Sequence, residues 1–496
     1  MDVDQDLQSL QEVRNCVAKA KEAQKVLSHY SQDEVDKLVG LMASYGYRAA
    51  QELAEIACEE SGFGRVESKR EKNIFATRNV YENIKDIKTV GIVHQDLEKQ
   101  VYEIATPMGI VAAIIPITNP TSTALFKILI AIKARCAIVL SPHPRGVRCT
   151  QASANVMKKA ISSIGAPEDL VGCLTIPTMA ATQELMKHPD IAVILATGGS
   201  GLVKAAYSSG KPAIGVGPGN VPAYIEKSAD IEHAVRCLVA SQTFDWGTIC
   251  ASEQAVVIDS AIEKKCLEEF SRQKAYICND KEIQMLESLM PSGSSMNPDI
   301  VGKSPVFIAQ KAGFSVPEST TILLAKQKGV GNSYPLSREK LGPILALYVE
   351  ENWEKACERC FEILNYGGMG HTLVIHSQDQ KIISAFALKK PAFRILVNAP
   401  SSQGGVGYAT GLVPSMTLGC GSLGGNISSD NITCKHLLNI KRIALGNSNL
   451  FPDIATPFVS LANQEKQKKS YHPDPFEDLP GPGKRYYIGP YNNPNI

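Results

Sequence analysis

The sequence carries no excess of charge of either sign. Its 51 lysines and arginines stand against 50 aspartates and glutamates among 496 residues, so the net charge is +1. A nearly neutral surface gives no reason to expect a nucleic acid or an anionic membrane as a partner. We therefore predict that neither is bound.

Long apolar runs and an export signal are also missing. The N-terminus MDVDQDLQSLQEVRN is polar and acidic, unlike a signal peptide. The most apolar stretch, residues 110–140, is interrupted by two prolines and three basic residues. Such a stretch does not span a bilayer unaided. The sequence therefore predicts a soluble, cytoplasmic protein.

The cysteines lack the spacing of a disulfide framework or a metal site. They number 13, are scattered along the chain, and are expected to be free thiols in the absence of an export signal. The one close pair, Cys357 and Cys360, lies in WEKACERCFEIL, which reads as an amphipathic helix. No second Cys/His pair accompanies it, so we predict no metal site.

The length of the chain leaves room for more than one hydrophobic core, and two domains are expected. Residues 7–60 show helical periodicity, and Ser31 followed by Glu34 forms a capping box at the start of one helix. Residues 89–118 change to a strand-like period. A turn near residues 95–99 predicts a hairpin there.

Strands and helices alternate through the rest of the chain. IAVILATGGSG reads as a strand that runs into glycines, whereas KILIAIKARC and LVKAAYSSG read as helices. Strands of a second unit, between about residues 231 and 440, are expected at AVVIDS, ILLAK, ILALYVE, TLVIHS and FRILVNAP. This alternation indicates α/β domains with mostly parallel, doubly wound sheets. From Pro452 onward Pro, Gly, Asn and Lys dominate, so a tail is expected rather than a third core.

Three polar segments carry the candidate chemistry. Cys250 follows Gly247 in FDWGTICASEQ, where a glycine lets the backbone approach a substrate and a thiolate can add to a carbonyl. Taken alone, a cysteine in such a loop is more often structural. Asn119 lies between two prolines, and a rigidly held amide suits a developing oxyanion. Residues 196–201, ATGGSG, follow a strand and open a helix, as at sites that bind a cofactor pyrophosphate.

Together these segments resemble the aldehyde dehydrogenase superfamily, and most closely its CoA-acylating branch. The likeness is strongest to the aldehyde dehydrogenase half of bifunctional aldehyde-alcohol dehydrogenases. It runs from about residue 60 to residue 443, in the family's order. The matching stretches are TPMGIVAAIIPITNPTSTALFK, VLSPHPRG, ATGGSGLVKAAYSSGKPAIGVGPGN, TFDWGTICASEQ, REKLGPILA, GGMGHT and SMTLGCGSLGGN.

The resemblance implies an aldehyde dehydrogenase-like α/β fold made of two domains, an oligomerisation segment and a tail. A Rossmann-type NAD-binding domain is expected over residues 1–228, with a β-hairpin arm of about residues 89–106 inserted in it. A catalytic domain that holds the nucleophilic cysteine is expected over residues 229–430. Residues 431–450 are expected to form an oligomerisation segment together with the arm, and residues 451–496 a Pro/Gly-rich tail.

The resemblance also implies a role for each candidate residue. Cys250 is the expected nucleophile, and Asn119 supplies the oxyanion-stabilising amide together with the Cys250 backbone N–H. Glu339 matches the glutamate that binds the nicotinamide ribose. His371 is a candidate base for the CoA thiol or a partner of Cys250, although a lone histidine often has a structural role. The other cofactor contacts are expected at Ser141, Pro142, His143, Thr197, Gly198, Gly199, Ser200 and Gly217.

A departure from the hydrolytic branch points to the reaction class. Hydrolytic relatives carry a general-base glutamate in a Glu-Leu-Gly-Gly context, whereas the corresponding GVGPGN here, residues 215–220, has no carboxylate. Attack of water on a thioester needs a positioned base. A thiol with a pKa of about 8.5 is already partly thiolate and needs less help. We therefore expect transfer of the acyl group to CoA.

The expected reaction converts an aldehyde, CoA and NAD reversibly into an acyl-CoA and NADH. Acetaldehyde is the first candidate by resemblance, with propanal, butanal, succinate semialdehyde and sulfoacetaldehyde as alternatives and NADP left open. A hydrolytic dehydrogenase and a non-catalytic nucleotide-binding scaffold are the competing hypotheses. The missing glutamate argues against the first, and the set of Cys250, Asn119 and Glu339 against the second. A homodimer or tetramer is expected, with an alcohol dehydrogenase or a bacterial microcompartment shell as further candidate partners.

Overall fold

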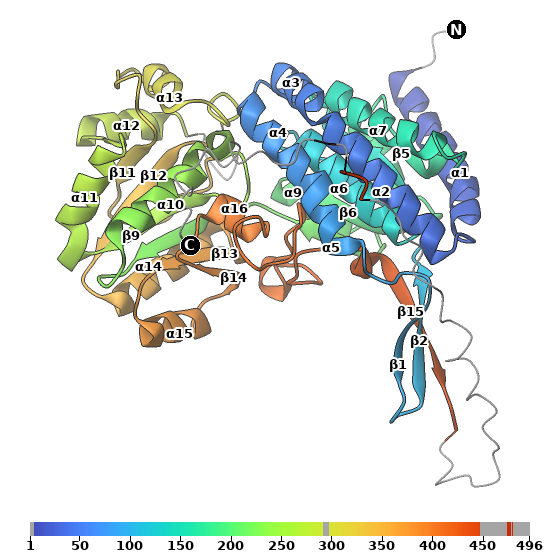
Figure 1. Ribbon diagram of the computed structural model, residues 1–496. Helices are drawn as coiled ribbons and strands as arrows, with labels where there is room; N and C mark the ends of the chain where they lie inside the picture. The colour runs from blue at the N-terminus through green and yellow to red at the C-terminus, as the bar shows by residue number, and fades with distance from the viewer. Residues whose placement is uncertain (1–3, 291–296, 447–473, 478, 480–496) are drawn as a thin grey trace.

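The computed structural model describes residues 4–290, 297–446, 474–477 and 479. Two α/β bodies lie side by side, and a narrow arm of strands projects from one of them (Figure 1). Each body is built on its own sheet, so the predicted α/β fold with two sheet-based units is confirmed.

Helices form the first part of the chain, as predicted. They are α1 (Gln5–Leu27), α2 (Gln32–Arg48), α3 (Ala50–Ser61), α4 (Val66–Ile74) and α5 (Val80–Ile84), with a π-helical turn at Phe75–Asn79. The predicted capping box opens α2, where Ser31 Oγ accepts from the Glu34 N–H at 3.3 Å and the Glu34 carboxylate accepts from the Ser31 N–H at 2.7 Å. Helices α2 and α4 pack on α6 (Pro120–Lys133), a helix that covers the first sheet.

The first sheet is parallel and has the strand order β5-β4-β3-β6-β7. Its strands are β3 (Ile110–Ile114), β4 (Ala137–Ser141), β5 (Val171–Cys173), β6 (Ile191–Thr197) and β7 (Ala213–Val216). Its helices are α6 (Pro120–Lys133), α7 (Val147–Ser162), α8 (Met179–Lys187) and α9 (Ser200–Tyr207). The direction of strand addition reverses between β3 and β6, as in Rossmann-type sheets.

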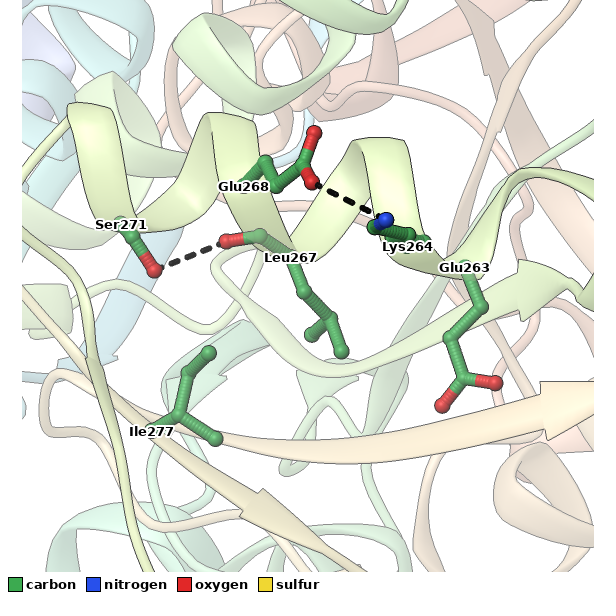
Figure 2. Close-up of a pocket in the computed structure, with 6 residues that line it drawn as sticks. All are labelled: Glu263, Lys264, Leu267, Glu268, Ser271 and Ile277. Carbon is green, nitrogen blue, oxygen red and sulfur yellow. Dashed lines mark hydrogen bonds and ion pairs between the residues drawn. The ribbon is translucent and has the colours of Figure 1, made fainter.

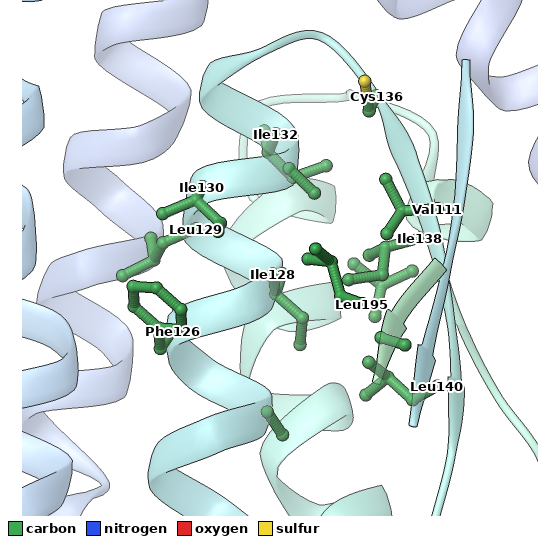
Figure 3. Packing of buried hydrophobic residues seen from close by; sticks show 14 of the residues in the cluster. Val111, Phe126, Ile128, Leu129, Ile130, Ile132, Cys136, Ile138, Leu140 and Leu195 are labelled. Atoms are coloured by element: carbon green, nitrogen blue, oxygen red, sulfur yellow. The ribbon is translucent and has the colours of Figure 1, made fainter. Parts of the chain in front are cut away.

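Helix α6 forms the centre of this core. All of its residues are buried, because the sheet covers one side and α2 and α7 cover the other. Ile128 and Ile132 point toward Val111 and Leu195 of the sheet, whereas Phe126 lies on the opposite side of the helix (Figure 3). Burial on both sides explains why this segment reads as a continuous apolar run and yet is a helix within a globular core.

The second sheet has seven parallel strands in the order β10-β11-β12-β9-β8-β13-β14. The strands are β8 (Val221–Ile225), β9 (Glu253–Asp259), β10 (Tyr276–Ile277), β11 (Leu323–Lys326), β12 (Ile344–Glu350), β13 (Gly370–His376) and β14 (Ala392–Val397). All five strands predicted for this unit are present. Alternate residues of β9 face opposite helical layers. Val256 and Ile258 pack with α10 (Ile231–Thr243) and α11 (Glu263–Arg272), whereas Ala255 and Val257 pack with α14 (Trp353–Gly367) and α15 (Gln380–Leu388).

The remaining elements of the second body are short. They are α12 (Asp280–Ser288), α13 (Pro305–Ala312) and α16 (Ser401–Gly405). The close cysteine pair lies on α14, where Cys357 and Cys360 are buried in the apolar layer against the sheet. All 13 cysteines fall within the described residues and are free thiols.

The predicted domain boundary at residue 228 is wrong by one strand. β8 ends at Ile225 and pairs in parallel with β9 and β13 of the seven-stranded sheet. The chain therefore crosses between the two sheets after β7, within residues 217–220. The error arose because VPAYI, residues 221–225, carries no sequence signal that assigns it to one sheet or the other.

The arm is a three-stranded antiparallel sheet with β2 in its centre. β1 (Gly91–Asp96) and β2 (Val101–Pro107) form the predicted hairpin, and β15 (Leu438–Ala444) pairs with the other edge of β2. Arg442 also donates to the Glu103 carboxylate at 3.0 Å. A segment over 330 residues away in sequence thus completes the arm (Figure 1).

Most of the predicted tail, residues 451–496, lies outside the described residues. Within the described part, Phe476 is buried and packs edge-on against Tyr47 at 5.5 Å between ring centroids. The Arg78 guanidinium lies 5.3 Å from the centre of the same ring. This short piece of the tail therefore docks on α2 and the π-helical turn. Among the described helices, none combines the length and apolarity needed to cross a membrane.

Candidate active site

The carboxyl ends of β3, β4 and β6 meet at one edge of the first sheet. Asn119 lies just beyond β3, Ser141 ends β4, and Thr197 ends β6 and leads into the glycines before α9. β3 and β6 flank the point where strand order reverses, and open α/β sheets bind ligands beyond the strand ends at such a point. Residues from distant predicted motifs thus share one edge.

The glycine turn before α9 leaves its backbone accessible. Gly199 is exposed, and a Cβ placed on it or on Gly217 would meet no atom within 4 Å. The Thr197 hydroxyl is buried without a hydrogen-bond partner among the described residues. Open glycine backbone, an unpaired hydroxyl and the first turn of α9 fit the phosphates of a dinucleotide. Ser200, at the start of α9, is exposed as well.

The residues predicted for the adenosine side differ in accessibility. Ser141 is buried, and its hydroxyl already shares a hydrogen bond of 2.9 Å with the Thr182 hydroxyl. Pro142 is buried, whereas His143 is exposed and its Nδ1 accepts from the Arg145 N–H at 3.1 Å. Of these three side chains, that of His143 is the one open to a ligand.

Cys250 lies in the loop between α10 and β9. Before it, Asp245 and Trp246 adopt left-handed φ values of 53° and 50°, which is uncommon for residues other than glycine. The Asp245 carboxylate fixes this turn by accepting from the Thr248 hydroxyl at 2.7 Å and the Arg65 N–H at 2.7 Å. The unusual backbone is therefore stabilised from outside the loop.

Gly247 packs closely against protein backbone. Its φ is +70°, and a Cβ there would come within 3.4 Å of the Gly342 backbone. The glycine therefore allows the cysteine loop to pack on the EKLGP segment that follows Glu339. The close contact that the structure shows at Gly247 is therefore with the backbone of Gly342.

Gly219 brings three predicted residues together. A Cβ on Gly219 would lie 2.1 Å from the Cys250 carbonyl oxygen and 3.2 Å from His371 Cδ2. The Gly219 N–H donates to the Glu339 carboxylate at 2.9 Å. Cys250, His371 and Glu339 therefore converge on the GVGPGN loop, where the close packing leaves no room for any side chain at residue 219.

Asn119 is held from the side of α4. Its Oδ1 accepts from Lys72 Nζ at 2.6 Å, and its Nδ2 donates to the Thr118 hydroxyl at 3.2 Å. Lys72 also donates to the backbone oxygen of Thr248, two residues before Cys250. This lysine therefore links the predicted amide donor to the nucleophile loop.

His371 is fully buried on β13. Its Nδ1 shares a hydrogen bond of 2.9 Å with the Thr372 hydroxyl, and its Nε2 has no partner among the described residues. Burial, reinforced by the nearby Arg394 guanidinium, lowers the pKa of His371 well below its ordinary value. The imidazole is therefore neutral near pH 7 and retains one unused ring nitrogen.

Burial also dominates the electrostatics of the thiol. It raises the pKa of Cys250 to about 12, an effect that Glu339 and Cys420 reinforce and Arg394 opposes. It likewise raises the pKa of Glu339 to about 8, against the hydrogen bond from Gly219. Near neutral pH the sulfur is a thiol, so forming the thiolate requires a base or a nearby positive charge.

Comparison with known proteins identifies the family of the chain. The aldehyde dehydrogenase family pattern matches residues 5–283. A solved acetylating aldehyde dehydrogenase from Geobacillus thermoglucosidasius is 54% identical with a TM-score of 0.88, over 90% of this chain and 98% of that one. The chain belongs to the aldehyde dehydrogenase family.

Two further members of the family extend the comparison. The bifunctional aldehyde-alcohol dehydrogenase of Escherichia coli K12 is 44% identical over 88% of this chain and 50% of its own length. This chain thus spans about half the length of the aldehyde-alcohol dehydrogenases that it matches. A structure of Rhodopseudomonas palustris propionaldehyde dehydrogenase with bound CoA and an acylated cysteine is 25% identical with a TM-score of 0.80, over 87% of this chain and 97% of that one.

A small cavity adjoins the nucleophile loop. Ile249, next to Cys250, forms part of its wall, and so does Lys72, which contacts Asn119. Most of the lining is apolar, and Glu71 and Gln403 add two polar side chains. The full lining consists of Glu71, Lys72, Phe75, Phe244, Ile249, Gln403, Val406, Tyr408 and Met416.

A second, more open depression is lined by residues of α11 and by Ile277 of β10 (Figure 2). Its polar side chains have partners in the protein, and Glu263 accepts from Lys326 of β11 at 2.8 Å. The Ser271 hydroxyl donates to the Leu267 carbonyl, and Lys264 pairs with Glu268. None of the predicted site residues lines it, so it has no part in the chemistry of the cysteine.

Sequence reasoning missed several residues of this aldehyde dehydrogenase site. Lys69 and Lys72 lie in the charged segment SKREKN, which is typical of a solvated helix, and yet both are buried. Asp245 lies in the quoted FDWGTIC segment, but its ion pairs with these lysines span more than 170 residues. Arg394 is buried on the edge strand β14. The sequence offered one signal for Arg394, namely a charged residue at an inward-facing position of a predicted strand.

Proposed function

We propose that this chain is a CoA-acylating aldehyde dehydrogenase that converts an aldehyde, CoA and NAD reversibly into an acyl-CoA and NADH. One observation carries the choice of acyl acceptor. The GVGPGN loop packs against Cys250 through Gly219, at a point where even a methyl group would collide. None of residues 215–220 carries a carboxylate, so this loop offers no side chain that could activate water against a thioester. The nearby Glu339 carboxylate accepts the Gly219 N–H.

The chain's own residues account for the first half-reaction. The Cys250 sulfur adds to the aldehyde carbonyl, and the oxyanion that forms is stabilised by the Asn119 amide and the Cys250 backbone N–H. NAD, when bound at the glycine turn before α9, supplies the hydride acceptor. Cys250 then carries the acyl group as a thioester.

The second half-reaction transfers the acyl group to CoA. His371 is the proposed base for the CoA thiol, because its imidazole is neutral and its Nε2 is unpaired. A neutral imidazole can accept a proton, whereas a buried imidazolium could not. The acylated cysteine and bound CoA in the R. palustris relative support this order of events.

The cavity favours a short, uncharged aldehyde. Its small size and mostly apolar walls suit acetaldehyde, propanal or butanal. Burial raises the pKa of Glu71, so a second negative charge in the same cavity would be strongly disfavoured. Lys72 donates to three protein oxygens and so has no hydrogen left for an anionic group of a substrate. We therefore propose acetaldehyde ahead of succinate semialdehyde and sulfoacetaldehyde.

We further propose a homodimer or tetramer that assembles through the arm. The outer edge of β15 is unpaired within the described chain, and β14 ends the larger sheet with the half-exposed apolar side chains Phe393 and Val397. Exposed edges of this kind pair readily with another strand.

A cytoplasmic location follows from the proposed use of NAD and CoA. An alcohol dehydrogenase partner or a microcompartment shell stays a further candidate, and NAD is proposed ahead of NADP.

Product analysis tests the proposed function. Purified protein is given NAD or NADP and each aldehyde, with and without CoA, and both acyl-CoA and free acid are quantified. Acyl-CoA as the main product, with little acid in either condition, is expected. Free acid formed at the same rate with and without CoA would establish the hydrolytic alternative. If no reduced cofactor formed under any condition, the chain would instead be a non-catalytic scaffold.

A further inference from the structure

We propose that Lys72 is a positioning residue that fixes the Asn119 amide for the oxyanion and places a buried positive charge beside the nucleophile loop. This inference rests on the proposed function, because it assigns Asn119 to the oxyanion. It goes beyond that function by naming the group that sets the amide's orientation.

The contacts of Lys72 use all of its donors. Its Nζ lies 2.6 Å from Asn119 Oδ1, 2.6 Å from Asp245 Oδ2 and 3.0 Å from the Thr248 carbonyl oxygen. An ammonium group has three hydrogens and no acceptor. Each hydrogen therefore has a partner, and the side chain, 3% exposed, has one preferred position.

This arrangement fixes which end of the Asn119 amide faces the substrate. Because Lys72 can only donate, the atom that faces it must be the amide oxygen. The Nδ2 group then points the other way, and one of its two hydrogens is directed to the Thr118 hydroxyl at 3.2 Å. The second hydrogen remains for an oxyanion. Without Lys72, nothing among the described contacts of Asn119 distinguishes the two amide orientations.

The neighbouring lysine clamps the backbone of the same loop. Lys69 lies three residues earlier on α4, on the same helical face. Its Nζ donates to the Thr118 carbonyl oxygen at 2.9 Å and to Asp245 Oδ2 at 3.0 Å. Lys69 thus holds the backbone that precedes Asn119, whereas Lys72 holds the Asn119 side chain. The division of contacts provides a matched control.

The charge of the cluster favours the reacting state. Two buried ammonium groups share the single Asp245 carboxylate, so these three groups together carry a net positive charge away from water. Such a charge costs free energy at rest. It is compensated when a thiolate or an oxyanion forms nearby, and the mutual attraction between Lys72 and a Cys250 thiolate supports this reading.

A double-mutant cycle on the acylation burst tests the proposal. Lys72→Met removes both the donor and the charge while keeping the aliphatic stem, and should lower the burst rate about 10²- to 10³-fold, as loss of an oxyanion-hole donor does. Asn119→Ala should cost a similar factor. Because Lys72 is proposed to act through Asn119, the double variant should be less than about tenfold slower than Asn119→Ala alone.

The controls separate positioning from folding. Lys69→Met disturbs the same ion cluster without touching the Asn119 side chain, so its burst should stay at least about tenfold faster than that of Lys72→Met. The KM for NAD should not change in Lys72→Met. Lys72→Gln keeps an N–H donor, so its burst rate should lie between those of Lys72→Met and wild type. It serves as the test variant if the methionine variant does not fold.

Three outcomes would overturn the proposal. These are a Lys72→Met burst within about threefold of wild type, effects of Lys72→Met and Asn119→Ala that multiply in the double variant, or equal losses in the Lys69 and Lys72 variants. A wild-type protein that gives no burst would instead contradict the proposed function itself. The two failures are therefore distinguishable.

Discussion

Gly219→Ala is the substitution that most directly probes how the site is assembled. The new Cβ would lie 2.1 Å from the Cys250 carbonyl oxygen, and ordinary contact begins near 3.4 Å. The opposing atom is backbone, so no flexible side chain can move aside. The Cys250 loop or the GVGPGN loop must therefore shift by roughly 1 Å, and a displacement of that size can cost about 10²-fold in rate.

The same substitution should also lower stability. Overpacking a dense interior by one methyl group typically costs about 1–3 kcal/mol of unfolding free energy. The loss should appear as a lower denaturation midpoint in urea with an unchanged m-value. Rapid mixing with aldehyde and NAD measures the acylation rate, and urea denaturation measures stability.

Gly411→Ala serves as the matched control, because a Cβ on that exposed glycine would meet no atom within 4 Å. It should leave both the burst and the midpoint close to wild type. A Gly219→Ala protein with a burst within about threefold of wild type and undiminished stability would refute the reasoning. It would mean that the two loops are not in the close contact on which the proposed geometry depends.

Four other predictions follow from the site. Cys250→Ser should abolish NADH formation while leaving NAD binding nearly intact, since a serine alkoxide is scarcely populated at neutral pH; turnover above a few per cent of wild type would mean that another cysteine is the nucleophile. Because burial raises the pKa of Cys250 to about 12, the thiolate fraction increases with pH, so the burst rate should rise between about pH 6 and about pH 8; a flat profile would contradict the protonated thiol. Glu71→Gln should raise kcat/KM for succinate semialdehyde relative to acetaldehyde by about tenfold, the effect of removing about 1.4 kcal/mol of repulsion; an unchanged ratio would place the anionic end of that substrate elsewhere. Light scattering at micromolar concentration should give a dimer or tetramer; a monomer would rule out the arm as a strong interface.

The fold could be predicted largely because its strands are apolar runs bounded by polar turns. AVVIDS and TLVIHS are buried on both sides and read as strands for that reason. β8 could not be assigned to a sheet, because a five-residue strand takes its neighbours from long-range pairing that leaves no local pattern. Of the arm, only the hairpin could be predicted from the local alternation of apolar and polar residues. Family likeness, rather than local pattern, linked it to the segment that forms β15.

The site shows the same division. Cys250, Asn119, Glu339 and His371 stand in motifs that a family likeness can identify. Lys72 and Asp245 do not, since their roles depend on an ion pair that joins α4 to the cysteine loop. The charge pattern of SKREKN indicated solvent, and burial of two lysines was favourable only because Asp245 and the loop carbonyls lie opposite them.

Pre-steady-state mixing with and without CoA tests the central claim most directly. With aldehyde and NAD but no CoA, the protein should release a burst of about one NADH per active site and then nearly stall, because the acyl group stays on Cys250. Addition of CoA should restore steady turnover and yield acyl-CoA. His371→Ala should slow this second phase more than the first. Rapid, CoA-independent turnover to a free acid, with no stall after the burst, would contradict the assignment.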